Sequence, residues 1–233
     1  MKFPTYKYET KKMDEGFRVV AGCDEVGIAP IAGPVVAATV ILDATSIGKQ
    51  RSKSKWWYRV RDSKTVDEKE RNELVSFIKD HCIDFGVGVV SHETIDEINI
   101  YQASLLAMEK SVSELNTVPD FLFLDGIHKL TKLSIVQQPV ISGDAKILSI
   151  SAASLVAKVA RDKILHEMHE IFPEYGFDKH KGYGTQFHKT ALMKHGVTPM
   201  HRQTFGFVAL CLKRMKSMNN FKKIFLAPEP SRT

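Results

Sequence analysis

The chain has 233 residues, of which 43% are hydrophobic and 26% are charged. This is the composition of an ordinary globular protein, and it excludes a chain that is disordered throughout. No window approaches eighteen uncharged apolar residues, so we expect no membrane-spanning helix. Residues 1–12 are polar, so we expect no secretory signal. Cys23, Cys82 and Cys211 lie far apart without a CxxC pair, which predicts free thiols in a reducing, cytoplasmic compartment.

Positive charge is concentrated in two segments of a chain whose net charge is +6. Residues 48–64 contain seven Lys or Arg and one acid, and residues 211–233 contain six and one. Either segment alone is explained as well by a solvated surface as by contact with a polyanion. The first also contains Trp56, Trp57 and Tyr58, and aromatic rings among cations are typical of contact with a nucleic acid strand.

The first half of the chain predicts three strands and one helix. Residues 35–42 are apolar and rich in β-branched side chains, as in a buried strand. Leu74, Phe77 and Ile78 are spaced as on one face of a helix. In chain order we expect a polar lead-in at 1–16, strands at 17–23 and 35–42, a basic loop at 45–62, a helix at 66–81 and a strand at 83–90.

The second half predicts two further strands and several helices. Ser91 is expected to cap a helical turn. In chain order we then expect a helix at 101–115, strands at 120–124 and 134–140, a long helix at 148–171, a loop rich in Gly and Lys at 175–185, and helices at 186–195 and 199–214. Strands that interleave with helices in this way predict an α/β fold, a mixed sheet with helices on its faces.

Acidic residues stand where predicted strands stop. Asp24 and Glu25 follow the first strand, and Asp125 follows the fourth. Strand ends bring residues distant in sequence to one rim of a sheet, where carboxylates repel each other unless a cation lies between them. Mg²⁺ and Mn²⁺ prefer such oxygen ligands. Asp162 is a fourth candidate, because it follows an alanine-rich helical face that we expect to be buried.

A purely structural role stays open for each of these acids. For each acid alone, we weigh a turn or helix cap at about two to one over a metal ligand, since acids after strands are common turn residues. Several well-known catalytic motifs are missing from the sequence: His166 and His169 do not form HExxH, no P-loop GxxxxGK[ST] occurs, and there is no Gly-x-Ser-x-Gly elbow.

Six ordered blocks of the sequence resemble the type 2 ribonuclease H family, ribonuclease HII. They run from about Val20 to Phe205, and their order makes the match specific although each block alone is weak. In chain order the blocks include Asp24-Glu25-Val26-Gly27, Asp62-Ser63-Lys64, Asn99-Ile100, Leu124-Asp125-Gly126, Gly143-Asp144-Ala145-Lys146 with Ala160-Arg161-Asp162, and His180-Lys181-Gly182-Tyr183.

The resemblance implies a ribonuclease H-like fold with a C-terminal helical extension. It implies a metal-dependent endoribonuclease that hydrolyses the RNA strand of RNA–DNA hybrids and incises DNA 5′ to embedded ribonucleotides. The products would carry 5′-phosphate and 3′-hydroxyl ends. The family's catalytic, metal-binding carboxylates fall on Asp24, Glu25, Asp125 and Asp162, the four acids singled out above, and they would bind two Mg²⁺ or Mn²⁺ ions.

The resemblance also implies a set of substrate-binding residues. Lys146 and the stretch from Ser149 to Ser154 would contact phosphate, and Tyr183 would contact the ribose beside the cut, where its hydroxyl could read the 2′-OH. Taken alone, Tyr183 is equally a packed loop tyrosine. The full set is Gly27, Ile28, Ala29, Lys64, Lys146, Ser149, Ser154, Lys181 and Tyr183.

One departure from the family pattern concerns residues 27–29. The family has Gly-Arg-Gly there, whereas this chain has Gly27, Ile28 and Ala29. Ile28 lacks a guanidinium that could hold phosphate, and Ala29 adds a Cβ where backbone would approach the ribose. We therefore expect weaker discrimination of a single embedded ribonucleotide, with hybrid cleavage less affected.

Two alternatives remain at this point. One is a ribonuclease H that acts on hybrids only and cleaves weakly at single ribonucleotides; the other is a non-catalytic relative that binds nucleic acid. We expect a monomer without membrane contact. The expected domains are the lead-in 1–16, a catalytic domain 17–210 and a basic tail 211–233.

Overall fold

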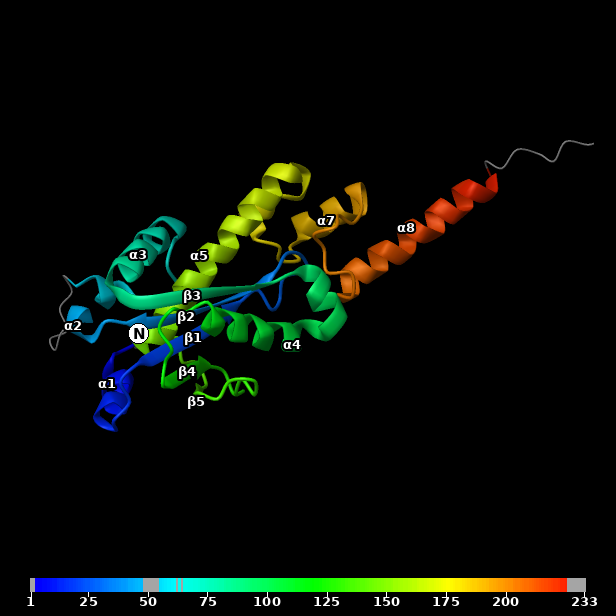
Figure 1. Cartoon of the computed structure of the whole chain (residues 1–233). Helices are drawn as coiled ribbons and strands as arrows, with labels where there is room; N and C mark the ends of the chain where they lie inside the picture. The colour runs from blue at the N-terminus through cyan, green and yellow to red at the C-terminus, as the bar shows by residue number, and fades with distance from the viewer. Residues whose placement is uncertain (1–2, 48–54, 62, 64, 226–233) are drawn as a thin grey trace, which may run out of the picture. The chain divides into compact units, whose positions relative to one another are not determined.

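The computed structural model describes residues 3–47, 55–61, 63 and 65–225, and the side chains up to residue 217. Figure 1 shows the elements in chain order. The strands are β1 (Val20–Val26), β2 (Val35–Leu42), β3 (Cys82–Val90), β4 (Phe121–Asp125) and β5 (Val136–Val140). The longer helices are α1 (Lys7–Asp14), α3 (Glu68–His81), α4 (His92–Ser113), α5 (Leu148–Ile171), α7 (Gln186–His195) and α8 (Gly206–Phe225). Short helical segments are α2 (Ala44–Ile47), η1 (Trp56–Arg59), η2 (Pro173–Tyr175) and α6 (Phe177–His180).

The described residues form two compact units. The first comprises residues 1–28 and 34–164, and the second comprises residues 29–33 and 165–233. The boundary near residue 164 falls within α5. The expected border of a basic tail at 210/211 falls within α8. No described helix is long and apolar enough to span a bilayer.

The first unit is built on one mixed sheet with the strand order β3-β2-β1-β4-β5. β1 pairs antiparallel with β2 and parallel with β4, and the other two pairings are antiparallel for β2–β3 and parallel for β4–β5. All eight residues of β2 are buried, as expected for a β-branched strand covered on both faces. The predicted mixed sheet flanked by helices is confirmed.

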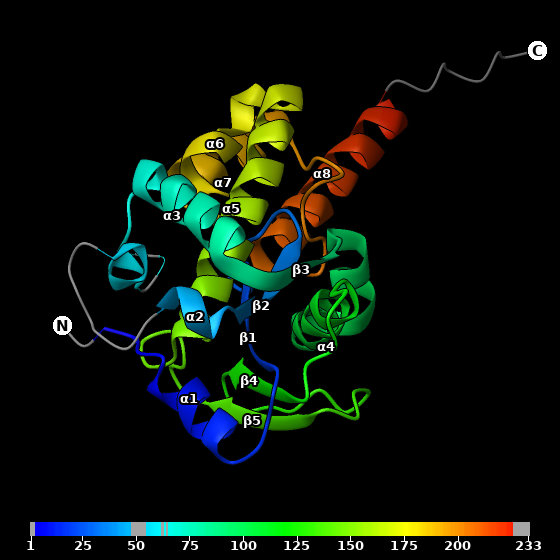
Figure 2. The same cartoon turned by 60° about the vertical axis from the view of Figure 1, so that its left-hand side comes forward.

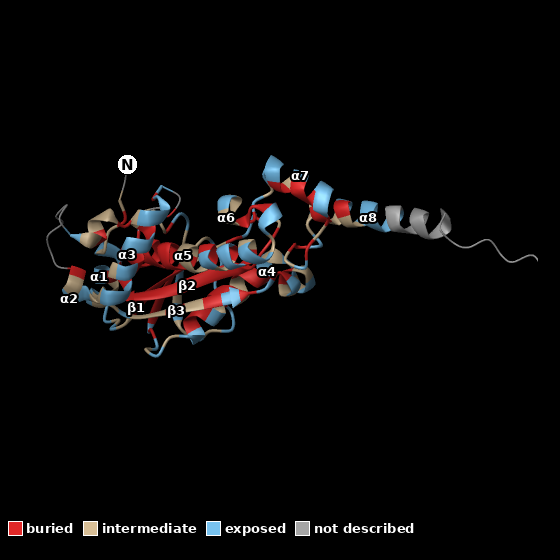
Figure 3. Cartoon of the chain, turned by 90° about the horizontal axis from the view of Figure 1, so that it is seen from above, coloured by how far each residue is buried: buried red, intermediate tan, exposed pale blue. Residues whose placement is uncertain are grey.

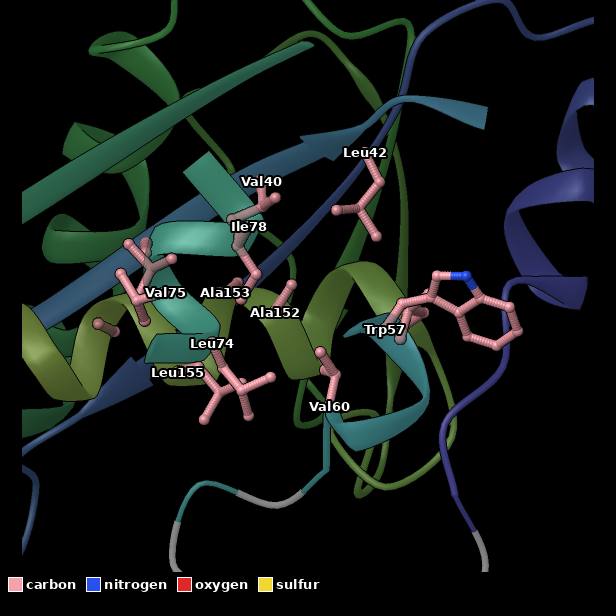
Figure 4. Close-up of a cluster of buried hydrophobic side chains, with 14 of the residues drawn as sticks. Val40, Leu42, Trp57, Val60, Leu74, Val75, Ile78, Ala152, Ala153 and Leu155 are labelled. Carbon is pink, nitrogen blue, oxygen red and sulfur yellow. The ribbon is translucent and has the colours of Figure 1, made fainter. Parts of the chain in front are cut away.

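Helices cover both faces of this sheet (Figure 2). On one face, Val40 and Leu42 pack against buried side chains of η1, α3 and α5, as seen in Figure 4. On the other face, the Thr39 hydroxyl lies 2.7 Å from the Ser111 hydroxyl of α4. Alternate residues of β2 therefore contact different helices, as the twofold repeat of a strand requires. Figure 3 shows β2 in the colour of buried residues, whereas most residues of the edge strand β3 are partly or fully exposed.

A glycine in β1 lets α5 approach the sheet closely. A Cβ on Gly22 would lie 2.4 Å from the backbone nitrogen of Ile150 and 2.4 Å from the carbonyl carbon of Ser149. Backbone atoms cannot give way as a flexible side chain can. Because side chains two apart on a strand share a face, α5 covers the face of β1 that also carries Asp24.

The segment expected to be a polar lead-in contains α1, which is tied to the start of α5. The Glu9 side chain is completely buried, and its Oε1 accepts a 2.8 Å hydrogen bond from the Ser149 amide. The Leu148 amide donates to the Thr5 carbonyl at 3.3 Å. Early amides of a helix have no partner within it, so Thr5 and Glu9 provide acceptors for two amides at the start of α5.

The second unit is organised around a completely buried arginine, Arg202. Its guanidinium donates to the carbonyls of Gly33 at 3.0 Å and Pro30 at 2.7 Å, and its amide donates to the Ile31 carbonyl at 3.0 Å. Ile31 in turn donates to the Gly182 carbonyl at 2.9 Å. Residues 29–33 are therefore fixed by hydrogen bonds to two loops of this unit.

Several predicted bounds differ from the structure. The first strand begins and ends three residues later than expected, so Asp24 and Glu25 lie within β1. The segment expected to be a basic loop contains η1 and most of α2. Helix α4 starts at residue 92, directly after Ser91, and the Ser91 side chain accepts a hydrogen bond from the Thr94 amide, as expected of a helix cap. The last helix spans 206–225 and not 199–214, because residues 200–202 instead bond to residues 31–33.

Candidate active site

Strand register brings two of the candidate acids together. β1 and β4 run parallel, and Cys23 is paired with Leu124. Asp24 and Asp125 each follow by one residue, so they occupy neighbouring positions at the same end of adjacent strands. Glu25 comes next in β1. Asp24 is 5% exposed, whereas Glu25 and Asp125 are partly exposed.

The Asp24 carboxyl lies in an environment rich in negative charge. Burial raises its pKa well above the usual range, and the charges of Glu25, Asp125 and Asp144 raise it further. A hydrogen bond with Ser154 on α5 acts in the opposite direction. The Asp24 Oδ1 accepts from the Glu25 amide at 2.8 Å, and the Asp125 Oδ1 accepts from the Gly143 amide at 2.6 Å.

The fourth candidate, Asp162, is held by two cations. Its Oδ1 accepts from the Lys158 ammonium at 2.6 Å, and its Oδ2 lies 3.5 Å from the Arg71 guanidinium. Asp162 is 7% exposed. Desolvation lowers the pKa of Lys158, and the contact with Asp162 opposes this effect. Removal of either partner would leave a buried charge without its counterion, which is costly.

These carboxylates fit divalent ions in donor chemistry, since all are hard oxygen ligands. Their side chains are not clustered as metal ligands: within the ranges that the structure describes, no three His, Cys, Asp or Glu residues form a group able to hold an ion. The hydrogen bonds above give a physical reason. Asp125 and Asp162 turn oxygens toward protein donors, which offsets the repulsion that converging carboxylates would feel.

Three residues near the site were not identified from the sequence. Asp144 contributes to the field at Asp24, and Lys158 and Arg71 pair with Asp162. Lys158 precedes Asp162 by four residues, a helical spacing that places two side chains on one face, so a signal for this pair was present. Nothing in the sequence pointed to Arg71, which comes from a different helix.

The candidate substrate residues of the first unit differ in exposure. Ser149 is completely buried, Ser154 is 7% exposed and Ile28 is 44% exposed. Lys146 is exposed, and its ammonium donates to the Ile141 carbonyl. Ser149 thus has no surface for a ligand in this conformation, and its visible roles are to pack against β1 and to donate its amide to Glu9.

The turn after β1 has little room for side chains. Gly27 has a φ of +101°, and a Cβ there would lie 2.4 Å from Nε of Arg161. The completely buried Arg161 donates from the same nitrogen to the Pro34 carbonyl at 2.9 Å. Glycine is therefore required at 27 by both conformation and contact.

Part of the first basic segment is neutralised within the protein. Arg59 forms a bidentate pair with Glu73 and also contacts Glu70, and Arg61 pairs with Glu70 at 2.9 Å. These contacts leave less positive charge for a polyanion than the sequence count suggests. Lys64, a predicted substrate residue, and residues 48–54 lie outside the described residues.

The remaining candidates belong to the second unit. Tyr183 is 41% exposed, and Ala29 is exposed. Lys181 is partly exposed and adopts a left-handed backbone conformation with φ of 49°. Tyr183 follows closely in the same turn, which presents its ring to solvent.

Comparisons with known proteins identify the family of the chain. The family model described as ribonuclease HII matches residues 21–208. A ribonuclease HII of Clostridioides difficile is 42% identical over 198 residues, covering 85% of this chain and 74% of that protein. A ribonuclease HII of Endomicrobium trichonymphae is 46% identical over 201 residues, covering 86% of this chain and 91% of that protein.

Solved structures show the same fold. The ribonuclease H2 of Pyrococcus horikoshii has a TM-score of 0.70 at 23% identity, covering 85% of this chain and 99% of that one. A Bst-RNase HIII solved in complex with Mn²⁺ has a TM-score of 0.67 at 15% identity, covering 85% and 70%. On the match of the family model and the identity of its relatives, the chain belongs to the ribonuclease HII family, whose members are metal-dependent ribonuclease H enzymes.

Proposed function

We propose that this ribonuclease H hydrolyses the RNA strand of RNA–DNA hybrids, and incises DNA 5′ to embedded ribonucleotides, at a site made by Asp24, Glu25, Asp125 and Asp162. The observation that carries the proposal is the register of β1 and β4, which sets Asp24 beside Asp125. The close contact between Gly22 and the start of α5 supports it, because that helix carries Asp162.

Each part of the chain has a defined task in this proposal. The four carboxylates would hold two Mg²⁺ or Mn²⁺ ions. Such ions, when bound, supply an activated water and stabilise the charge on the leaving 3′ oxygen. Lys158 and Arg71 orient Asp162, and Ser154 bonds to Asp24. Cleavage would leave 5′-phosphate and 3′-hydroxyl ends.

The test replaces a carboxylate by its amide. Asp24→Asn and Asp125→Asn keep the shape of the side chain and remove its charge, so each should lower cleavage by about a hundredfold or more, with hybrid binding still measurable. Glu73→Gln is the matched control, because Glu73 is an exposed carboxylate on α3 that pairs only with Arg59 among the contacts described. Wild-type rates in either Asn variant, with Mg²⁺ or Mn²⁺, would refute the metal-site assignment.

A second candidate, favoured by residues 27–29, is an enzyme that acts well on continuous hybrids and poorly at single embedded ribonucleotides. Ile28 is 44% exposed, so an apolar side chain occupies the surface where the family has arginine. Gly27, which the fold requires for steric reasons, is kept.

The two candidates are separated by a gain-of-function variant. Ile28→Arg combined with Ala29→Gly restores the family tripeptide, and it should raise incision 5′ to a single ribonucleotide more than cleavage of a hybrid. Both substrates are assayed side by side, and the cuts are mapped. Equal single-ribonucleotide activity before and after restoration would show that residues 28 and 29 do not limit discrimination.

A further inference from the structure

Three histidines of the second unit meet around the turn that carries Tyr183. His188 and His201 are completely buried, and their Nε2 atoms lie 2.9 Å apart. The ring of His180 stacks on that of His188 with centroids 4.3 Å apart. Two imidazole nitrogens at this distance form a hydrogen bond only if one carries a proton and the other does not.

The partners of the two buried rings determine where the protons are. Nδ1 of His188 lies 2.9 Å from the Tyr183 carbonyl, which can only accept, so Nδ1 must donate. A neutral imidazole has one N–H, so Nε2 of His188 accepts and Nε2 of His201 donates. Nδ1 of His201 then accepts from the Thr198 amide at 3.1 Å and from its hydroxyl at 2.8 Å. These four contacts agree with a single pair of tautomers.

This chain of hydrogen bonds ends on the backbone of Tyr183. The Tyr183 carbonyl accepts from His188 and also from the Thr185 amide at 2.8 Å, and its own amide donates to the His180 carbonyl at 2.9 Å. The main chain of Tyr183 is thus held on both sides, while the side chain remains 41% exposed. An immobilised backbone with an exposed ring is the arrangement expected of a group that must meet a ligand at a set position.

We propose that His188 and His201 are positioning residues that fix Tyr183 for contact with the substrate through one obligatory pair of tautomers. The proposal rests on the proposed function and on the contact with the ribose beside the cut that the family resemblance implies for Tyr183. Neither histidine touches substrate; each acts through the Tyr183 carbonyl.

The electrostatic surroundings support a neutral His188. Burial lowers the pKa of His188 to about 4, and the neighbouring His180 contributes in the same direction. Among the ring contacts of the described residues, the titratable groups that face the pair are His180 from α6 and Tyr175 from η2, whose ring lies 5.3 Å from that of His201. Burial raises the pKa of Tyr175 and lowers that of His180, so neither ring carries charge near neutral pH.

The tautomers can be measured without any activity assay. Long-range ¹⁵N–¹H correlation spectra of the full chain near pH 7 distinguish Nδ1–H from Nε2–H imidazoles and both from imidazolium. We expect the Nδ1–H form for His188 and the Nε2–H form for His201. The reverse assignment, or a protonated ring at either position, would overturn the proposal.

The positioning role is tested by two substitutions at His188. Asn puts an amide N–H near the place of Nδ1 and can still donate to the Tyr183 carbonyl, whereas Gln puts its amide near Nε2 and cannot. His188→Gln should lower kcat/KM on a continuous hybrid by about tenfold, and His188→Asn should restore most of this loss. Circular dichroism and Tm verify that each variant is folded.

A double-mutant cycle separates positioning from a general loss of structure. In a Tyr183→Ala background there is no ring to position, so His188→Gln should then cost less than about twofold. Equal losses in both backgrounds would overturn the proposal. Failure of the proposed function gives a different result, because the wild type would then cleave no hybrid in Mg²⁺ or Mn²⁺ whichever tautomers the spectra show.

Discussion

Replacement of Glu9 by glutamine should make the protein more stable at neutral and alkaline pH. Glu9 is completely buried, and its Oε2 has no hydrogen-bond partner. Burial raises its pKa from 4.5 to about 7, while the Ser149 amide opposes the rise. At about 1.4 kcal/mol for each pH unit, an ionised Glu9 costs the fold about 3 kcal/mol. Glutamine has the same shape and keeps the acceptor for Ser149.

The sign of the pH dependence follows from where the proton binds. The folded protein holds the Glu9 proton more tightly than the unfolded chain, so the free energy of unfolding decreases as pH rises from 4.5 through about 7. The advantage of Glu9→Gln over the wild type should therefore grow by about 2 kcal/mol between pH 5 and pH 8. The pKa of the adjacent Tyr6 is raised by burial and by Glu9, which keeps that phenol out of this window.

The measurement is urea unfolding of both proteins across this pH range, with the difference taken at each pH so that other titrating groups cancel. Glu15→Gln is the matched control from the same segment, because Glu15 is exposed and pairs with Lys12 at 2.8 Å, and it should show a constant difference. A constant difference for Glu9→Gln as well would mean that Glu9 is not buried as an acid against α5.

Two other predictions concern the sheet and the metal site. Gly22→Ala should lower the free energy of unfolding by about 3 kcal/mol or prevent folding, because its Cβ would meet backbone of α5 at 2.4 Å. The control is Gly206→Ala, which has open space around it and should leave the Tm unchanged or raise it. Equal Tm losses in the two variants would contradict the packing argument. Millimolar Mg²⁺ or Mn²⁺ should raise the wild-type Tm by binding the folded state and should not raise that of Asp24→Asn. An equal rise in both proteins would place the ion elsewhere, and a rise that persists when a chelator is present would show that ion binding does not cause it.

The parts of the fold that follow local rules were predictable. The bounds of β2, α5 and α7 match the structure, because an uninterrupted β-branched run or a long apolar periodicity determines each of them. The pairing of Asp24 with Asp125 followed from the rule that strand ends share a rim, and the parallel register of β1 and β4 confirms that the two residues are neighbours. The role of all four acids, Asp24, Glu25, Asp125 and Asp162, as metal ligands stays a prediction.

The parts that depend on a distant partner were not predictable. In the sequence Glu9 is one more acid in a polar stretch, and its hydrogen bond to the Ser149 amide at the start of α5 appears only in the folded structure. Residues 200–202 have helical neighbours, but their hydrogen bonds to residues 31–33 hold them outside α8. In each case a contact between segments far apart in the chain outweighs the local preference.

The same distinction explains why the candidate site was easier to find than its supports. A position that binds a hard divalent ion accepts only a few residue types, so the presence of Asp or Glu there, directly after a strand, carries information. A supporting group needs only to complement whatever lies beside it. His188 and His201 are thirteen residues apart with no recognisable spacing, and each ring alone could adopt either tautomer. Their state is determined only when the Tyr183 carbonyl at one end and the Thr198 amide at the other are both in place, which is information that only the folded chain contains.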